Sequence, residues 1–275
     1  MDFIEVKVQC HPEYTDFLIA ELGEIEFNSF VENEEGFDAY IEEALFSEEA
    51  LKEVFGRYAE AKVQYTFALQ PKVNWNEEWE KNYDPIDVDG QCYIRATFHA
   101  PRPEFPLEIV IVPKMSFGTG HHQTTWQMVK HQMAINHQGK RVLDVGCGTA
   151  ILALVAAKLG ASYVEGFDID QWSVENSLEN AALNGFNQLV VKQGTIAEVK
   201  PQGPFDIILA NINRNVLLAE IPIYTELIGA GGQLLLSGFY EQDIADIQQK
   251  AESCGLTLQN SSTRDKWAAL VFQKA

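Results

Sequence analysis

Two hydrophobic periods alternate over the first 70 residues of the chain. Apolar residues recur at every second position in FIEVKVQC, from Phe3, and at helical spacing in PEYTDFLIAELGEI, from Pro12. A hairpin turning at residues 33–36, a helix capped by Ser47 and a closing strand AKVQYTFALQ follow. The order strand, helix, strand, strand, helix, strand is the split βαβ pattern of a ferredoxin-like domain. We therefore expect a small α+β domain of this kind near residues 1–70.

A polar stretch that carries two tryptophans follows this first pattern. The segment PKVNWNEEWEKNYDP fits neither period well, and we interpret residues 73–84 as a linker. Trp75 and Trp79 are four residues apart, so they would share one face of a helix. Such a pair is most often a packing face between domains. The first domain is thus expected to cover residues 1–72 and the second to cover residues 85–275.

Strands and helices alternate regularly from Thr124 onward. The apolar strands are RVLDV, YVEGFDI, QLVVKQ, FDIILANI and GQLLLSG, and helical patterns such as ILALVAAKLG and WSVENSLENAALNG separate them. This alternation predicts an α/β domain with a parallel sheet and helices on both faces. The last two strands, LTLQNS and KWAALVFQK, are joined by a short turn, so the sheet should finish with an antiparallel edge. Two further strands, CYIRATFH and LEIVIVP, precede this region.

Composition places the chain among ordinary globular proteins. Of its 275 residues, 46% are hydrophobic and 22% are charged. No apolar run approaches the ~18 residues of a membrane helix, and the N-terminus has no secretory signal pattern. We therefore expect a cytoplasmic protein without membrane contact. The cysteines are widely spaced, which argues against structural zinc and a disulfide framework and favours mostly buried, reduced thiols. They are Cys10, Cys92, Cys147 and Cys254.

The net charge of −20 is concentrated near the N-terminus. Residues 1–60 hold 17 acidic and 3 basic residues. A surface this acidic repels phosphate backbones and attracts basic partners. We expect no direct binding of nucleic acid and favour a protein rich in lysine and arginine as the partner. The alternative is that the acidic surface merely aids solubility.

The stretch DVGCGTA at residues 144–150 joins a strand to a helix, where α/β proteins bind cofactors. A dinucleotide fingerprint needs a third glycine where Ile151 stands, and a phosphate loop needs a Lys-Ser/Thr pair that is missing here. An acid before Gly146 and Gly148, and a second acid, Asp168, at the end of the next strand, instead suit S-adenosylmethionine (AdoMet). The glycines let the backbone approach the cofactor, and the second carboxylate can accept hydrogen bonds from both ribose hydroxyls.

This pattern resembles the seven-strand AdoMet-dependent methyltransferases, which have a Rossmann-like fold with an antiparallel strand. Two positions depart from it. Ala150 stands where the pattern usually has a third glycine, and Thr195 stands where many members carry an acid that contacts the adenine. How the adenine is held is therefore left open.

Two more motifs make the resemblance more specific. The loop MSFGTGHHQTT at residues 115–125, the segment LANINRN at residues 209–215 and the split N-terminal domain are similar to those of the PrmA-type methyltransferases of a large-subunit ribosomal protein. The resemblance covers essentially the whole chain. The family loop usually has Thr-His-Pro where His121, His122 and Gln123 stand here.

The resemblance implies both cofactor-binding and catalytic positions. Thr125 begins a helix whose N–H groups and hydroxyl can take the cofactor's carboxylate. Asn211 and Ile212 are expected to be catalytic, because side-chain and backbone carbonyls at this place hold the attacking amine by its hydrogens. The expected AdoMet-binding residues are Thr125, Gly146, Gly148, Asp168 and Asn211.

The adjacent histidines His121 and His122 suggest a metal site or a general base. Neighbouring residues in a regular element do not point at one ion, and no third ligand is evident, so we expect no metal. A base is less needed than it seems, because a deprotonated lysine attacks the sulfonium directly. Catalysis can then consist mostly of alignment.

The resemblance implies an AdoMet-dependent protein N-methyltransferase acting on lysine or N-terminal amino groups of a ribosomal protein, with several methyl groups possible on one nitrogen. The acidic domain would recruit the basic substrate, and the chain is expected to be a monomer. Two alternatives stay open. One is a methyltransferase of the same fold that acts on a small molecule or another protein, and the other is a non-enzymatic ribosome-assembly binder.

Overall fold

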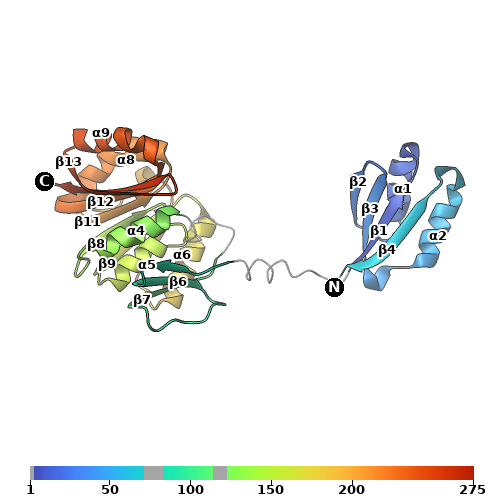
Figure 1. The fold of residues 1–275 in the computed structure, drawn as a ribbon, viewed down its shortest axis with the longest axis horizontal. Coiled ribbons are helices and arrows are strands. Elements are labelled where there is room, and N and C mark those ends of the chain that lie inside the picture. The colour runs from blue at the N-terminus through green and yellow to red at the C-terminus, as the bar shows by residue number, and fades with distance from the viewer. Residues whose placement is uncertain (1–2, 71–82, 114–122) are drawn as a thin grey trace. The chain divides into compact units, whose positions relative to one another are not determined.

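The computed structural model of the chain describes residues 3–70, 83–113 and 123–275. The chain divides into two units, Met1–Asn82 and Tyr83–Ala275 (Figure 1). Most of the expected linker, including Trp75 and Trp79, lies outside the described residues, as do His121 and His122.

The N-terminal unit forms a four-stranded antiparallel sheet in the order β2-β3-β1-β4. Its elements are β1 (Phe3–Gln9), η1 (Pro12–Tyr14), α1 (Thr15–Gly23), β2 (Ser29–Asn33), β3 (Gly36–Glu42), η2 (Glu43–Leu45), α2 (Glu48–Arg57), η3 (Ala59–Ala61) and β4 (Gln64–Gln70). Val6 of β1 is buried with Leu18 of α1 and Leu51 of α2 in one hydrophobic core, so both helices cover the same face of the sheet. The Ser47 hydroxyl caps α2 as expected, accepting from Ala50 N–H at 3.3 Å. This topology agrees with the ferredoxin-like arrangement expected from the sequence.

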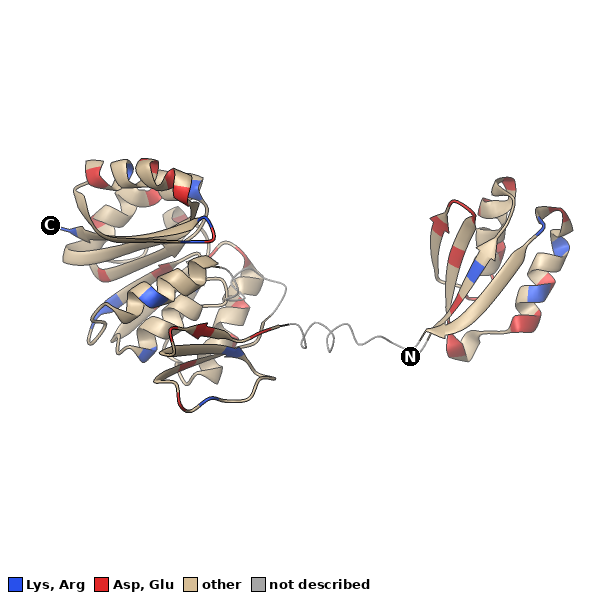
Figure 2. Cartoon of the chain, in the orientation of Figure 1, with Lys and Arg blue, Asp and Glu red and all other residues tan. Residues whose placement is uncertain are grey.

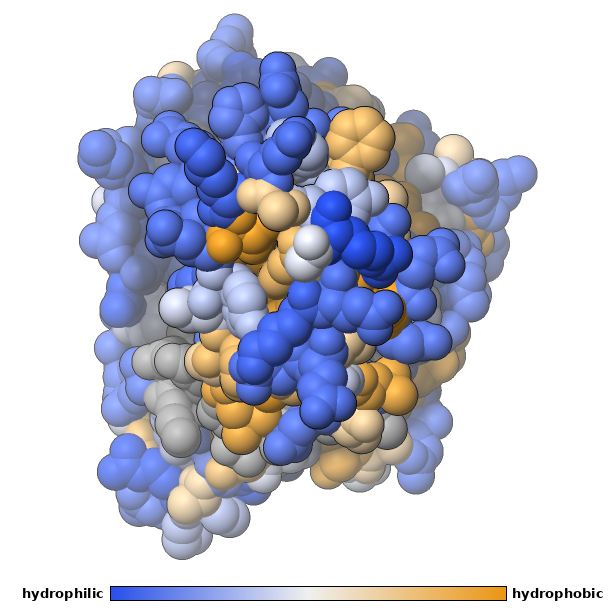
Figure 3. Space-filling model, turned by 90° about the vertical axis from the view of Figure 1, so that its right-hand side faces the viewer, coloured by the Kyte–Doolittle hydropathy of each residue, from blue (hydrophilic) through white to orange (hydrophobic). Residues whose placement is uncertain are grey.

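Acidic residues are spread over the helices and strands of this unit (Figure 2). The same unit faces the viewer in Figure 3, where the surface is mostly hydrophilic with apolar side chains between the polar ones. The exposed apolar residues include Phe67 and Leu69 of β4, which are 42% and 48% exposed. The surface therefore combines negative charge with scattered apolar contacts.

The C-terminal unit contains a seven-stranded sheet in the order β10-β9-β8-β11-β12-β14-β13. Its elements are β8 (Arg141–Val145), α5 (Ile151–Lys158), β9 (Tyr163–Asp168), α6 (Gln171–Leu183), β10 (Val190–Gln193), α7 (Ile196–Val199), β11 (Phe205–Asn211), α8 (Arg214–Leu227), β12 (Ile228–Tyr240), η4 (Glu241–Asp243), α9 (Ile244–Ser253), β13 (Leu256–Arg264) and β14 (Trp267–Lys274). Together with α4 (Gln123–Met133), helices α5 and α6 cover one face, while α8 and α9 cover the other (Figure 1). The predicted doubly covered sheet is confirmed.

The expected antiparallel pair ends the sheet, with one difference in its placement. The reversed strand β14 lies inside the sheet, antiparallel to both β12 and β13, and β13 forms the edge. Burial explains this order. Five consecutive residues of β14, 268–272, are buried, whereas most of β13 is exposed. The more apolar strand therefore takes the position that has neighbours on both sides.

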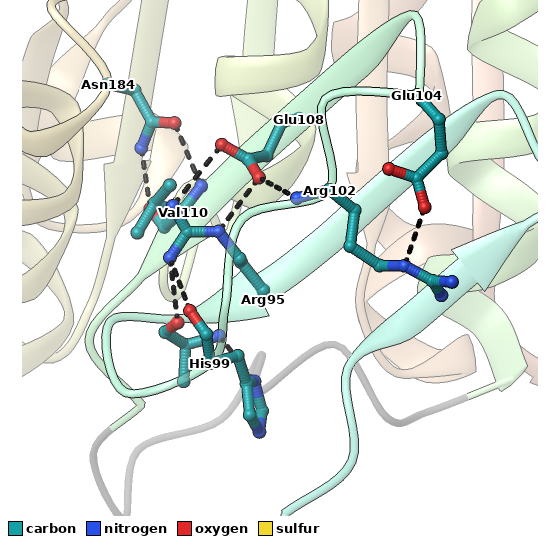
Figure 4. Close-up of polar contacts among 8 residues, drawn as sticks. Arg95, His99, Arg102, Glu104, Glu108, Val110 and Asn184 are labelled. Atoms are coloured by element: carbon teal, nitrogen blue, oxygen red, sulfur yellow. Dashed lines mark hydrogen bonds and ion pairs between the residues drawn. The ribbon is translucent and has the colours of Figure 1, made fainter.

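A separate three-stranded sheet precedes the main one. It consists of β5 (Ile86–Val88), β6 (Cys92–Ala96) and β7 (Leu107–Ile111), and the two predicted strands β6 and β7 are parallel. Arg95 braces the loop between them (Figure 4). Its guanidinium donates to both carboxylate oxygens of Glu108, at 2.9 and 3.3 Å, and to the carbonyls of Ala96 and His99. A part-buried ion pair thus holds the connection between these two parallel strands in place.

Asparagines on α6 tie this small sheet to the large one. The Asn180 side-chain oxygen accepts from Val112 N–H at 2.8 Å, and its nitrogen donates to the Thr149 carbonyl at 3.0 Å. Asn184, the residue after α6, instead binds both backbone groups of a single residue, accepting from Val110 N–H and donating to its carbonyl (Figure 4). These side chains supply the hydrogen bonds that another strand would otherwise give to the edge of β7.

No helix in the three described ranges is both long and apolar enough to cross a membrane. All four cysteines are free thiols, and Cys92 and Cys147 are the buried ones.

The Asn180 contacts lead to a prediction about stability. Asn180→Ala should lower the free energy of unfolding by ~2–6 kcal/mol, because the part-buried Val112 N–H and the buried Thr149 carbonyl lose their partners at roughly 1–3 kcal/mol each. Gln171→Ala is the control, since its amide binds only Glu175 on the exposed side of the same helix. Chemical denaturation of both variants measures the effect, and equal losses would contradict the assigned role of Asn180.

Candidate functional site

The parallel strands bring three of the predicted residues to one edge of the sheet. Val145, the last residue of β8, pairs with the residues that precede Asp168 on β9 and Asn211 on β11. Gly146 follows Val145 directly, so these three positions lie side by side. This edge, at the carboxyl ends of parallel strands, is where α/β sheets bind ligands.

The turn after β8 has an unusual backbone. Gly146, Gly148 and Ala150 all have left-handed conformations, with φ of +64°, +54° and +64°. Glycine adopts this region freely, whereas an L-residue such as alanine is disfavoured by roughly 1–2 kcal/mol. Ala150 therefore occupies a position that favours glycine sterically, which accounts for the glycine in the sequence pattern. Ala150 is also the residue before α5 and gives that helix no side-chain cap.

The carboxylate of Asp168 binds the turn and can still accept further hydrogen bonds. One oxygen accepts from Gly148 N–H at 2.9 Å, and the other accepts from Asp170 N–H at 3.0 Å. A carboxylate has about four lone-pair directions. Each oxygen can therefore accept one more hydrogen bond, which is the capacity needed to hold two neighbouring hydroxyls.

Asn211 and Thr125 are in contact although they are far apart in the sequence. The Asn211 amide nitrogen donates to the Thr125 hydroxyl at 3.4 Å. Thr125 lies in the first turn of α4 and is buried. Because the nitrogen side of the amide faces Thr125, the oxygen side is the one that can accept a hydrogen bond from a ligand.

Ile212 follows Asn211 and is partly buried. Its N–H donates to the Ser237 carbonyl at 3.2 Å, and its side chain lies against Gly146. All five predicted cofactor residues and Ile212 are thus described, and Gly146, Asp168 and Asn211 are brought together at the sheet edge.

Asp144 is almost completely buried and lies beneath the turn. Its carboxylate accepts from Ala153 N–H at 3.1 Å, in the first turn of α5. The pKa of the Asp144 carboxyl is raised from an ordinary 3.8 to about 7, chiefly because burial disfavours the charged form. The nearby charge of Asp168 raises this pKa as well, and the Ala153 hydrogen bond opposes the shift.

Two exposed apolar residues beside Asp168 were missed from the sequence. Ile169 is 71% exposed and Trp172 is 72% exposed. Large apolar side chains this exposed often mark a binding surface. The signal that could have found them is the position of apolar residues directly after a strand-end acid. Thr195, by contrast, is occupied in capping α7, since its N–H and hydroxyl both donate to Glu198 at 2.8 Å.

The structure suggests no metal centre in the parts it describes, where no three metal-ligating side chains gather. His121 and His122 lie outside the described residues, together with most of the loop 115–125.

Comparison with known proteins adds to this geometry. The family model described as "Ribosomal protein L11 methyltransferase (PrmA)" matches residues 4–275. A ribosomal protein L11 methyltransferase from Phocaeicola vulgatus is 44% identical over 278 residues, covering 99% of each chain. One from Porphyromonas gingivalis is 45% identical over 260 residues, covering 94% of this chain and 90% of the other. A crystal structure of ribosomal protein L11 methylase from Lactobacillus delbrueckii subsp. bulgaricus superimposes with a TM-score of 0.62 at 29% identity, covering 70% of this chain and 99% of that one.

The raised pKa of Asp144 predicts a pH dependence of stability. Between pH ~4 and ~7 the folded chain binds this proton more tightly than the unfolded chain does, so Asp144 makes stability fall as pH rises through that window. Asp144→Asn keeps an acceptor for Ala153 N–H but does not titrate. As pH rises through this window, the free energy of unfolding of the variant should increase relative to that of wild type by up to about 1.4 kcal/mol per pH unit. Denaturation at pH 5 and pH 8 measures the difference, and a constant difference would contradict the assignment.

Proposed function

The chain belongs to the PrmA family of ribosomal protein L11 methyltransferases, and from this premise we propose that it transfers methyl groups from AdoMet to lysine and N-terminal amino groups of ribosomal protein L11. The observation that best supports the reaction is the meeting of the left-handed glycine turn, Asp168 and Asn211 at one edge of a parallel sheet. The carboxylate of Asp168, the glycines of the turn and the amide of Asn211 each suit a different part of the proposed methyl transfer.

The residues at this edge fit AdoMet. We assign the ribose hydroxyls to Asp168, whose two oxygens each keep acceptor capacity. Gly146 and Gly148 would let the backbone approach the methionyl part, and the first turn of α4 at Thr125 would accept its carboxylate. The exposed side chains of Ile169 and Trp172 suit the flat face of the adenine ring. Contacts of this kind would hold the adenine without an acid at Thr195.

AdoMet supplies a methyl group on a sulfonium, which is already a strong donor. Asn211 accepts a hydrogen bond from the neutral amine and turns its lone pair toward that methyl group. A nitrogen–carbon bond forms as the carbon–sulfur bond breaks, and the product ammonium releases a proton to solvent. Alignment of this kind can supply ~7–11 kcal/mol of barrier lowering. No metal or dedicated base is needed in this scheme.

The N-terminal unit is proposed to recruit the basic substrate. Within residues 3–60, each of the three basic side chains is already paired with an acid of the same unit: Lys7 with Glu5 at 3.8 Å, Lys52 with Glu48 at 2.6 Å and Arg57 with Glu21 at 2.9 Å. The excess of acidic residues is therefore not neutralised internally (Figure 2). A protein rich in lysine and arginine provides the missing positive charge, whereas a nucleic acid backbone is repelled.

A ribosomal substrate places the reaction in the cytoplasm, and we propose that the chain acts there as a monomer. The alternatives are a methyltransferase of the same fold with another acceptor and a non-enzymatic assembly factor.

Labelled AdoMet separates these functions. The full chain is incubated with isolated ribosomal proteins and methyl-labelled AdoMet, and the products are resolved by mass spectrometry. The proposal expects label on L11 at amino groups. Label on another acceptor supports the first alternative, and AdoMet binding without turnover supports the second.

Asp168 is expected to be essential for cofactor affinity. Asp168→Ala should weaken AdoMet binding at least tenfold, because charge-assisted hydrogen bonds to the ribose are lost. Asp170→Ala is the matched control, since that neighbouring carboxylate caps α6 by accepting from Trp172 and Ser173 N–H groups. Isothermal calorimetry compares the two, and an unchanged affinity in folded Asp168→Ala would remove this residue from the site.

Asn211 is expected to affect chemistry more than cofactor affinity. Asn211→Ala should lower the single-turnover rate at saturating AdoMet by more than it lowers AdoMet affinity, because the amine then samples unproductive orientations. Asn211→Asp keeps an acceptor and should retain more activity than alanine. Equal rates for wild type and Asn211→Ala would leave Asn211 as a turn residue.

A further inference from the structure

We propose that Ile212 is a positioning residue that couples the cofactor turn, residues 146–150, to the amine-binding loop, residues 211–213. Its side chain lies against Gly146 and its backbone lies against Gly238, and both contacts are possible because glycine has no Cβ. The inference rests on the function proposed above for the catalytic role of Asn211. Its geometric part, the coupling of Ile212 to the two glycines, can be tested without a methyl acceptor.

The side chain of Ile212 fills the space where residue 146 would carry a Cβ. An ideal Cβ on Gly146 would lie 2.5 Å from Ile212 Cγ2 but 3.9 Å from Ile212 Cβ. The first distance is a clash, and the second is an ordinary van der Waals contact. Gly146 is therefore required by its positive φ and also by this one methyl group. A displacement of the turn toward Ile212 would therefore meet this methyl group.

The backbone of Ile212 fills the corresponding space at Gly238. A Cβ on Gly238, whose φ is +94°, would lie 2.1 Å from the Ile212 carbonyl oxygen, 2.7 Å from its carbon and 2.8 Å from its nitrogen. These are backbone atoms, so no side-chain rotation relieves the clash. Gly238 sits at a register shift in the pairing of β12 with β14, between Ser237 and Phe239. The bulge turns this glycine toward Ile212.

Each residue of the loop is thus anchored to a different element. Asn211 contacts Thr125 on α4, and Ile212 lies between the β8 turn and the β12 bulge. The side chain of Asn213 caps α8 by accepting from Val216 N–H at 3.1 Å. Ile212 is the member of this loop that contacts the cofactor turn, so it sets where Asn211 presents its carbonyl to the amine.

A purely structural role for Ile212 makes a different prediction. Loss of core packing would lower the free energy of unfolding. It would also lower AdoMet affinity and the rate of the chemical step to a similar degree. A positioning role separates these quantities, because the turn governs AdoMet affinity and the loop governs amine alignment.

The first test is a double-mutant cycle in the full chain, read out as AdoMet affinity by calorimetry. Gly146→Ala should weaken binding at least tenfold. Adding Ile212→Ala removes Cγ2 and should recover at least threefold of that loss, while Ile212→Val keeps this methyl group and should recover none. If the effects of Gly146→Ala and Ile212→Ala on the free energy of AdoMet binding are additive, the proposed coupling is overturned. This cycle needs no acceptor, so it stays decisive even if L11 is not the substrate.

The second test separates affinity from chemistry. Gly238→Ala should lower the single-turnover rate on the methyl acceptor at least tenfold, and by a larger factor than it lowers AdoMet affinity. Gly231→Ala is the matched control, because Gly231 lies in the same strand with a φ of +72° and has nothing within 4 Å of its Cβ position. Equal rates in the two variants would overturn the proposal. If Gly238→Ala does not fold, Ile212→Ala replaces it, and a single-turnover rate equal to wild type then overturns the proposal.

Discussion

The left-handed turn between Gly146 and Ala150 is the constraint on which the rest of the site depends. Backbone atoms bind some groups of this turn, such as the Cys147 N–H, which donates to the Phe167 carbonyl, but side chains bind both backbone groups of Gly148 and the Thr149 carbonyl. Asp168 accepts from the Gly148 N–H, Ser177 donates to the Gly148 carbonyl at 2.8 Å and Asn180 donates to the Thr149 carbonyl. The turn is therefore stabilised by polar residues of β9 and α6, and one of them, Asn180, also accepts from the N–H of Val112, directly after β7.

The local patterns in the sequence predicted most of this fold. Period-2 and helical repeats located the strands and helices of both units, and the glycine turn with Asp168 located the sheet edge. These features are encoded within a few residues of one another. The position of β14 inside the sheet was not predicted, because strand order depends on which strand buries more apolar surface and not on its neighbours in the sequence.

The features of the site that the sequence did not reveal are all long-range. Gly238 matters only because a bulge in β12 faces Ile212, and Asn180 matters only because the edge of β7 lies beside α6. Neither belongs to a recognisable motif, since each is defined by a contact between distant segments.

Negative charge has different physical effects in the two units. The acidic side chains of the N-terminal unit are largely exposed, so their attraction for a basic partner extends only over a Debye length of ~8 Å at physiological ionic strength and weakens as salt is added. Asp144 is buried, and its charge is controlled by desolvation and by Asp168, which mobile ions screen much less. Salt is therefore expected to weaken the proposed capture of a basic protein more than it affects the turn proposed to hold the cofactor. A change in the exposed charge of the N-terminal unit would then alter the proposed recruitment without altering the geometry of the edge that carries Gly146, Asp168 and Asn211.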